Sequence, residues 1–208
     1  MSVTEAPWYS ALAPFVERSD VIVELSAPFH TPRGVRVDSV PGVFLRLPRW
    51  TGEAFKDDFG KKTAAMVDVD GEHLFAELAI LRLLERDGWE GRWVNTYSGG
   101  GEVWKYLTDW RDVPRRDQTS RPIRDERARA LLSAIADKSG NRFAGCWDVF
   151  AWRGNQYAFL EAKRQAPKYK DHVKPSQEAW VRAALSFSTI PLTPESFGFV
   201  QWDYSQPL

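Results

Sequence analysis

The chain has 208 residues, of which 43% are hydrophobic and 27% are charged, and its 28 basic and 28 acidic residues give a formal net charge of zero. This length and composition allow a sizeable buried core, whereas the neutrality argues against a protein that coats nucleic acid with a uniformly basic surface. A single cysteine excludes an internal disulfide. No segment approaches the ~20 apolar residues of a membrane-spanning helix, and no signal-peptide pattern is present. We therefore expect a cytoplasmic protein without a membrane partner.

Residues 1–66 are rich in proline and in residues that favour strands. Short β-branched and apolar runs occur at 21–25, 35–37 and 43–47. We expect a small β-rich N-terminal extension that packs on the domain formed by residues 67–208.

Residues 72–88 have the apolar periodicity of a helix that ends at a glycine. At about 100° per residue, Leu74, Leu81 and Leu84 lie within about 60° of Glu77. Glu77 is therefore expected in the middle of the apolar face. A carboxylate rarely occupies such a position unless it is paired or bound to a metal. The alternative, in which Glu77 reaches solvent at an edge of the face, remains open.

The next stretch, about residues 90–145, contains further predicted elements. A hairpin is expected from 92–97 and 103–107, followed by an arginine-rich polar loop and a helix near 125–138.

Residues 145–163 predict two short strands joined by a two-residue turn at 154–155, because glycine at position 154 can adopt the positive φ of such a turn. This turn sets the register and places Asp148 directly opposite Glu161. Since side chains alternate along a strand, Lys163 is expected on the same face as Glu161.

This arrangement predicts a site for a divalent cation. Two carboxylates directly opposite each other, with Cβ atoms about 5 Å apart, repel and destabilise a sheet. A hard cation such as Mg²⁺ removes that repulsion and keeps positions for water and phosphate. Lys163 beside the cation could orient the attacking water or stabilise charge on a phosphate oxygen. The alternative is a solvated hairpin face without a chemical role.

A basic segment follows the second strand. Residues 163–174 contain one acidic residue and five basic ones, namely Lys163, Arg164, Lys168, Lys170 and Lys174. A phosphate backbone that reaches the predicted site would pass here, so Arg164, Lys168, Lys170 and Lys174 are candidate nucleic-acid contacts. The alternative is a solvated loop.

The last elements are a helix near 176–185 and a strand at 197–202. The helix carries Gln177 on the same face as Trp180, Val181 and Ala184. A glutamine on an apolar face needs a hydrogen-bond partner.

Together these motifs resemble the PD-(D/E)XK nuclease superfamily, and most of all its VRR-NUC branch. The similarity covers about residues 70–208. Trp147 stands where that pattern usually has proline. The residues that carry the resemblance are Gly145-Cys146-Trp147-Asp148-Val149, Phe159-Leu160-Glu161-Ala162-Lys163 and Gln177-Glu178-Ala179-Trp180.

The resemblance implies an α/β fold with a restriction-endonuclease-like core, in the order helix, mixed sheet with a central hairpin, helix. The segment of about residues 90–145 would then be an insertion in this core. It also implies that Glu77 joins Asp148 and Glu161 in binding Mg²⁺ or Mn²⁺, that Lys163 assists the water and the phosphate, and that Gln177 supports the site through a water or a substrate phosphate. For Gln177 the alternative is an ordinary polar residue of the first helical turn.

We therefore expect a divalent-metal-dependent nuclease that hydrolyses phosphodiester bonds, with DNA favoured over RNA as its partner. A non-catalytic nucleic-acid-binding module on the same fold is the main alternative. A glycosidase that uses Asp148 and Glu161 is a further alternative, which Lys163 argues against because it would keep both carboxylates ionised. The sequence leaves homodimer formation open.

Overall fold

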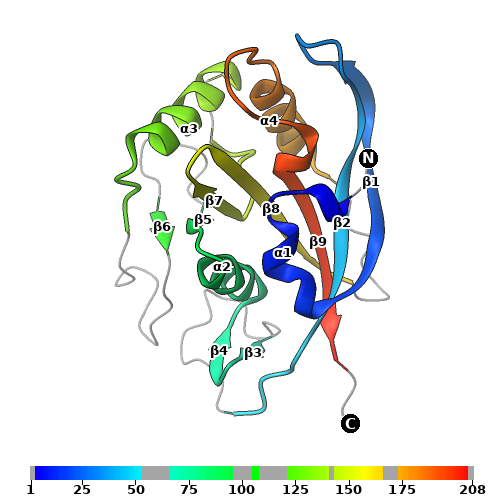
Figure 1. Cartoon of the computed structure of the whole chain (residues 1–208), viewed down its shortest axis with the longest axis vertical. Coiled ribbons are helices and arrows are strands. Elements are labelled where there is room, and N and C mark those ends of the chain that lie inside the picture. The colour runs from blue at the N-terminus through cyan, green and yellow to red at the C-terminus, as the bar shows by residue number, and fades with distance from the viewer. Residues whose placement is uncertain are drawn as a thin grey trace.

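The structure is a computed structural model that describes residues 3–52, 66–95, 105–107, 121–140, 143–165 and 173–205. Across these residues the fold is mixed α/β, with a seven-stranded sheet covered by helices on both faces and a small two-stranded sheet (Figure 1). The order of the large sheet is β1-β2-β9-β8-β7-β5-β6.

The elements of the described residues are as follows. The large sheet contains β1 (Val16–His30), β2 (Arg36–Leu47), β5 (Glu90–Asn95), β6 (Lys105–Leu107), β7 (Val149–Arg153), β8 (Gln156–Arg164) and β9 (Phe197–Tyr204). The small sheet contains β3 (Val67–Val69) and β4 (Glu72–Leu74). The α-helices are α1 (Tyr9–Leu12), α2 (Ala76–Arg86), α3 (Glu126–Lys138) and α4 (Pro175–Leu185), and short 3₁₀ turns occur at Val3–Glu5, Ala13–Phe15 and Pro194–Ser196.

The β7–β8 hairpin forms the centre of the sheet in the expected register. Its pairs run from Arg153 opposite Gln156 to Val149 opposite Leu160. Gly154, at the turn, has a φ of 59°, which only glycine adopts at little cost. The local turn therefore fixes which residues of the two strands face each other, as the sequence predicts.

The direction of the strands brings one set of strand ends together. β9 is parallel to both β2 and β8, whereas β7 is antiparallel to β8. The carboxyl ends of β2, β9 and β8 therefore lie at the same end of the sheet as the amino end of β7. This end is at the bottom of Figure 1, where β9 points toward the C-terminus.

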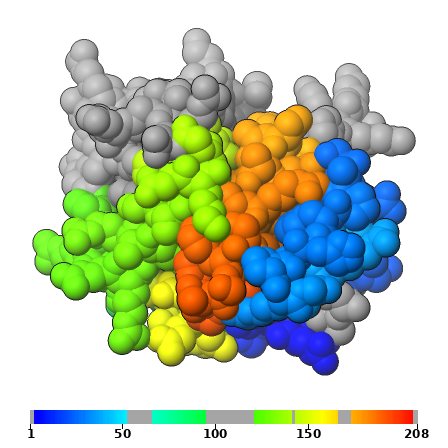
Figure 2. Space-filling view, turned by 90° about the horizontal axis from the view of Figure 1, so that it is seen from above, coloured from blue at the N-terminus to red at the C-terminus, as the bar shows by residue number. Residues whose placement is uncertain are grey.

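The two faces of the sheet carry separate hydrophobic clusters. Along β8, Leu160 and Ala162 pack in the cluster that contains the apolar residues of α1 and α2. Phe159, one residue from Leu160, packs in the cluster that contains those of α3 and α4. Alternation along the strand thus assigns each side chain to one face. Seen from above, α3, the chain between α4 and β9, and the β1–β2 hairpin lie side by side (Figure 2).

The N-terminal residues contribute strands to the large sheet itself. β2 pairs with β9, and β1 forms the outer edge beyond β2. A buried carboxylate links this edge to α4, because Glu178 accepts hydrogen bonds from the Ser26 backbone N–H at 2.8 Å and from the Ser26 hydroxyl. The residues expected as a β-rich extension are thus continuous with the central hairpin through β9.

The first long helix begins later than the sequence periodicity predicts. Glu72 and His73 belong to strand β4, and the helix starts at Ala76. The reason is a tight turn at Asp70 and Gly71, which both have positive φ, of 53° and 82°. This pair favours a hairpin, so the prediction of a helix from residue 72 is wrong over its first four residues.

The other predicted elements correspond to α3, α4, β9 and the β5–β6 pair, as far as the described residues extend. Among the helices that the structure describes, none is long and apolar enough to cross a membrane.

Candidate active site

The site lies at the end of the sheet where the β7–β8 ladder stops. The last backbone pair is Val149 with Leu160. One residue further, the backbone N–H of Asp148 donates to Glu161 Oε2 at 3.3 Å. The backbone N–H of Ala162 donates to Asp148 Oδ2 at 3.1 Å. Each carboxylate therefore binds the backbone of the opposite strand, and the two acids are held side by side.

The backbone of Asp148 is fixed from two more directions. Its carbonyl accepts a hydrogen bond from the Val94 N–H of β5 at 2.7 Å. The preceding Trp147 is fully buried and stands edge-on to Phe197 and Phe199, at 5.3 and 6.3 Å between ring centroids. A buried tryptophan thus anchors this position, where proline in the resembled pattern would restrict the backbone.

Lys163 completes the group on the α3–α4 face. Its Nζ lies 2.7 Å from Glu161 Oε1, and the side chains of Lys163 and Glu161 are 15% and 4% exposed. Glu161 therefore binds an ammonium group through one oxygen and the Asp148 N–H through the other. An ion pair this well shielded from water is stronger than one on the surface.

The electrostatics of the site centre on Asp148. Burial raises the pKa of Asp148 well above its ordinary value, and the negative charges of Glu161 and then Glu77 raise it further. Lys163 and the Ala162 N–H act in the opposite direction and do not outweigh them. Ionised Asp148 is therefore disfavoured, and a bound cation would relieve the crowding of negative charge.

Glu77 belongs to α2, which packs on the other face of the sheet from Glu161 and Lys163. It lies in the first turn of α2. It is half-buried, so its carboxylate is neither fully solvated nor fully enclosed. Its charge contributes to the pKa of Asp148. The two groups therefore interact electrostatically across the end of the sheet.

The donor atoms fit a hard divalent cation in part. Asp148 and Glu161 supply adjacent carboxylate oxygens, and Mg²⁺ is commonly bound by one or two carboxylates together with water and phosphate. Among the described residues, no three His, Cys, Asp or Glu side chains are close enough to form a complete ligand group. The pair therefore suits a cation that keeps much of its water, and Glu77 does not complete a group of three ligands with Asp148 and Glu161.

Gln177 has a structural role at the start of α4. Its Oε1 accepts a hydrogen bond from the Lys174 N–H at 2.9 Å, and its own N–H donates to the Lys174 carbonyl at 2.9 Å. Gln177 thus caps the helix. The helix start also packs tightly on the segment that leads to Asp148, because a Cβ at Gly145 would overlap the Ser176 carbonyl oxygen.

The candidate nucleic-acid contacts are only partly described. Lys174 is exposed at the start of α4. Arg164 forms an ion pair with Asp203 at 3.5 Å and lies over the Tyr204 ring at 4.6 Å. Lys168 and Lys170 lie outside the described residues. Arg164 therefore projects to the α2 face, whereas Lys163 projects to the other.

Cys146 lies two residues before Asp148 but is unsuited to nucleophilic chemistry. It is buried, and burial raises the pKa of its thiol well above the ordinary value, with further contributions from Glu161 and Asp148. The thiolate, which is the reactive form, is therefore disfavoured.

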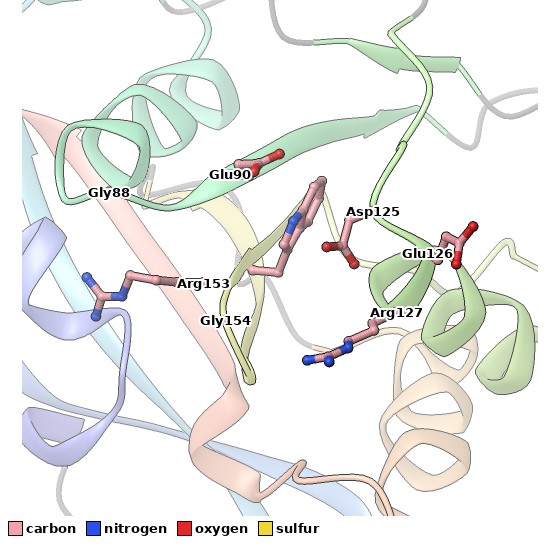
Figure 3. A pocket seen from close by; sticks show the side chains of 8 residues that line it. Gly88, Glu90, Asp125, Glu126, Arg127, Arg153 and Gly154 are labelled. Atoms are coloured by element: carbon pink, nitrogen blue, oxygen red, sulfur yellow. The ribbon is translucent and has the colours of Figure 1, made fainter.

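A cavity that the sequence gave no reason to expect lies at the opposite end of β7. It has a volume of about 400 Å³, and its charged lining residues are Glu90, Asp125, Glu126, Arg127 and Arg153 (Figure 3). Three of these groups already have partners: Asp125 accepts from the Ala128 N–H at 2.8 Å, Arg127 donates to Asn155 at 3.1 Å, and Arg153 pairs with Asp87 at 3.0 Å. Figure 3 shows Arg153 pointing away from Asp125 and Arg127. The lining thus offers few free polar groups.

Comparison with protein-family models, with curated proteins and with solved structures finds no match.

Proposed function

We propose that the protein is a divalent-metal-dependent nuclease with a restriction-endonuclease-like core. The observation that carries the proposal is the side-by-side placement of Asp148 and Glu161, with Lys163 paired to Glu161, at one end of a mixed sheet. A central hairpin with helices on both faces of the sheet supports the same proposal.

In this proposal the residues have distinct tasks. Asp148 and Glu161 hold Mg²⁺ or Mn²⁺, which when bound polarises a phosphate oxygen and acidifies water. Lys163 stabilises the negative charge that develops on the phosphate as the water oxygen bonds to phosphorus and the bond to the leaving oxygen breaks. Glu77 orients a water molecule at the α2 side. Gln177 keeps α4 packed against the segment before Asp148, which is a positioning role.

The burial of Glu161, more than the charge of Lys163, disfavours the glycosidase alternative. Lys163 does not keep both acids readily ionised, because the pKa of Asp148 is raised well above its ordinary value. A protonated Asp148 could serve as a general acid. The Glu161 side chain, however, is only 4% exposed and has partners at both oxygens. A sugar carbon cannot approach such a carboxylate.

The test is a cleavage assay with single-stranded, duplex and branched DNA and RNA. We expect cleavage with Mg²⁺ or Mn²⁺, binding without cleavage with Ca²⁺, and no cleavage by Asp148→Asn. Asp137→Asn, an equivalent change at an exposed position of α3, is the matched control and should cleave normally. If every substrate binds and stays intact at micromolar protein, the non-catalytic binding module replaces the nuclease.

A further inference from the structure

Two arginines from distant parts of the chain lie over one tyrosine ring beside the candidate active site. The guanidinium carbon of Arg164 is 4.6 Å from the centroid of Tyr204, and that of Arg49 is 5.3 Å from the same centroid. We refer to Arg49, Arg164 and Tyr204 as the arginine–tyrosine clamp. Its residues come from the end of β8, the end of β9 and the segment after β2.

The backbone of the clamp is fixed by the parallel strands. Leu47 of β2 pairs with Tyr204, and Arg164 pairs with Trp202. Two hydrogen bonds continue these pairs, from the Ser205 N–H to the Leu47 carbonyl at 2.9 Å and from the Gln165 N–H to the Trp202 carbonyl at 2.8 Å. Arg49 is held by a bridge to Val67. The cations are thus positioned by the sheet before any ligand binds, which lowers the entropic cost of binding.

The charges of the described residues around the clamp leave it positive. Asp203 lies 3.5 Å from Arg164 and neutralises part of its charge. Arg46 of β2 lies nearby, and its charge is balanced by its pair with Glu17. It also donates to the Tyr204 carbonyl at 3.2 Å. The Arg164 side chain remains 40% exposed, and Arg49 is exposed. Among the residues that the structure describes, two arginines against one carboxylate therefore face solvent at this point.

We propose that the arginine–tyrosine clamp binds the phosphate backbone of a single nucleic-acid strand. A guanidinium group matches the oxygens of a phosphate through two parallel hydrogen bonds, and stacking on an aromatic ring holds its plane in place. The proposal deepens the proposed nuclease function by naming how the substrate strand is held, but binding can be measured when no cleavage occurs.

The position of the clamp favours a flexible strand. Arg164 directly follows Lys163, so their Cα atoms are about 3.8 Å apart, yet their side chains project to opposite faces of the sheet. A backbone bound at both must bend around the end of the sheet. A single strand bends easily around such an edge, whereas a duplex is stiff over this length and resists so sharp a bend.

The experiment measures fluorescence anisotropy of a labelled 20-residue oligodeoxythymidine in EDTA, which prevents metal-dependent cleavage. We expect Arg49→Ala and Arg164→Ala each to weaken binding. Each should also reduce the magnitude of the slope of the logarithm of the binding constant against the logarithm of the salt concentration by about 0.7, the value for one phosphate contact of a single strand. The double variant should lose about 1.4 of that slope. Arg36→Ala is the matched control, because Arg36 is 63% exposed and pairs with Asp38 at 3.7 Å at the other end of β2.

The outcomes separate the clamp from the nuclease. If the double variant binds like the wild type and like Arg36→Ala, the clamp does not bind the strand, even when the protein cleaves. The same conclusion follows if the wild type does not bind the oligonucleotide. If the double variant binds weakly while the protein cleaves nothing, the clamp stands and the nuclease fails. A duplex of the same length that binds more tightly, with the same loss in the double variant, contradicts the preference for a single strand. Thermal melts of each variant establish that the fold is intact.

Discussion

The backbone N–H of Asp148 donates to the carboxylate of Glu161, so the two acids are held together by the sheet itself. The return contact, from the Ala162 N–H to Asp148, closes the arrangement. Two carboxylates at the end of a strand pair would otherwise turn away from each other, because like charges directly opposite destabilise a sheet. The fold thus maintains a repulsion that a bound cation would remove.

The first prediction concerns Asp148→Asn without metal. The asparagine keeps an acceptor for the Ala162 N–H but removes the charge that opposes Glu161. We expect the variant to be more stable at neutral pH. The like-charge pair costs up to about 1 kcal/mol, which corresponds to a melting temperature about 2–4 °C higher for a chain of this size. Thermal melts in EDTA measure the change.

The same variant should have a characteristic pH dependence. Because the folded pKa of Asp148 is raised above the ordinary value of 3.8, the native state binds more protons than the unfolded state between the two pKa values, and wild-type stability falls as pH rises through this range. The gain in stability from Asp148→Asn should therefore be absent below the pKa of Asp148 in the unfolded protein. It should grow with pH and level off above the pKa of Asp148 in the folded protein. Asp137→Asn should show no such trend, and a constant advantage at every pH would contradict the raised pKa.

Local sequence patterns were sufficient to predict the centre of the site. The turn at residue 154 determines the register of β7 and β8 by itself, and the positions of Asp148, Glu161 and Lys163 follow from counting along the two strands. The periodicity of α3 and α4 was equally local. At Asp70 and Gly71, the helical periodicity of the following residues conflicts with a turn signal, and the turn determines the structure, so a strand stands where the periodicity predicts the first turn of a helix.

Features that depend on distant residues could not be predicted. Arg49 and Arg164 meet on Tyr204 only because β9 is parallel to both β2 and β8, and no pattern near any of the three residues indicates it. The partner of Gln177 was also undetermined, since either a substrate phosphate or a nearby backbone N–H would satisfy a glutamine at the start of a helix.

The second prediction concerns protons released by metal binding. At a pH where Asp148 is partly protonated, Mn²⁺ must displace that proton. Titration calorimetry in two buffers with different ionisation enthalpies should therefore give different apparent binding enthalpies. Asp148→Asn should bind Mn²⁺ much more weakly and release no proton. Glu77→Gln should weaken binding less, because we expect contact through water. Equal affinity in the wild type and Asp148→Asn would show that the two carboxylates do not share a cation.

The third prediction compares two glycines. In Gly145→Ala the new methyl group overlaps the Ser176 backbone, so α4 must shift, at a cost of about 1–3 kcal/mol. In Gly154→Ala nothing lies near the new methyl group, but the φ of 59° is strained for alanine and costs about 1–2 kcal/mol. Both variants should melt at a lower temperature.

Metal binding distinguishes them. Gly145 is three residues from Asp148, whereas Gly154 is at the opposite end of β7. We expect only Gly145→Ala to bind Mn²⁺ more weakly. If Gly145→Ala keeps the wild-type affinity, the packing of α4 on this segment does not position Asp148.

The last prediction separates the role of Lys163 in stability from its role in catalysis. Lys163→Ala leaves the buried carboxylate of Glu161 without its counter-charge, which should destabilise the metal-free protein by about 3 kcal/mol. Since the positive charge of Lys163 lowers the pKa of Asp148, that pKa should also rise further. Mn²⁺ can then neutralise Glu161 in place of the ammonium group. We therefore expect Mn²⁺ to raise the melting temperature of Lys163→Ala more than that of the wild type, while cleavage is lost.

Lys163→Arg is the control because it keeps the charge in an altered shape. It should retain most of the metal-free stability and respond to Mn²⁺ like the wild type, with reduced cleavage, since a guanidinium group is larger and its donors lie in a fixed plane. Thermal melts with and without Mn²⁺, together with the cleavage assay, measure all three proteins. If Mn²⁺ stabilises Lys163→Ala no more than the wild type, the cation and the ammonium group do not both act on Glu161, and the proposed division of roles between Glu161 and Lys163 is wrong.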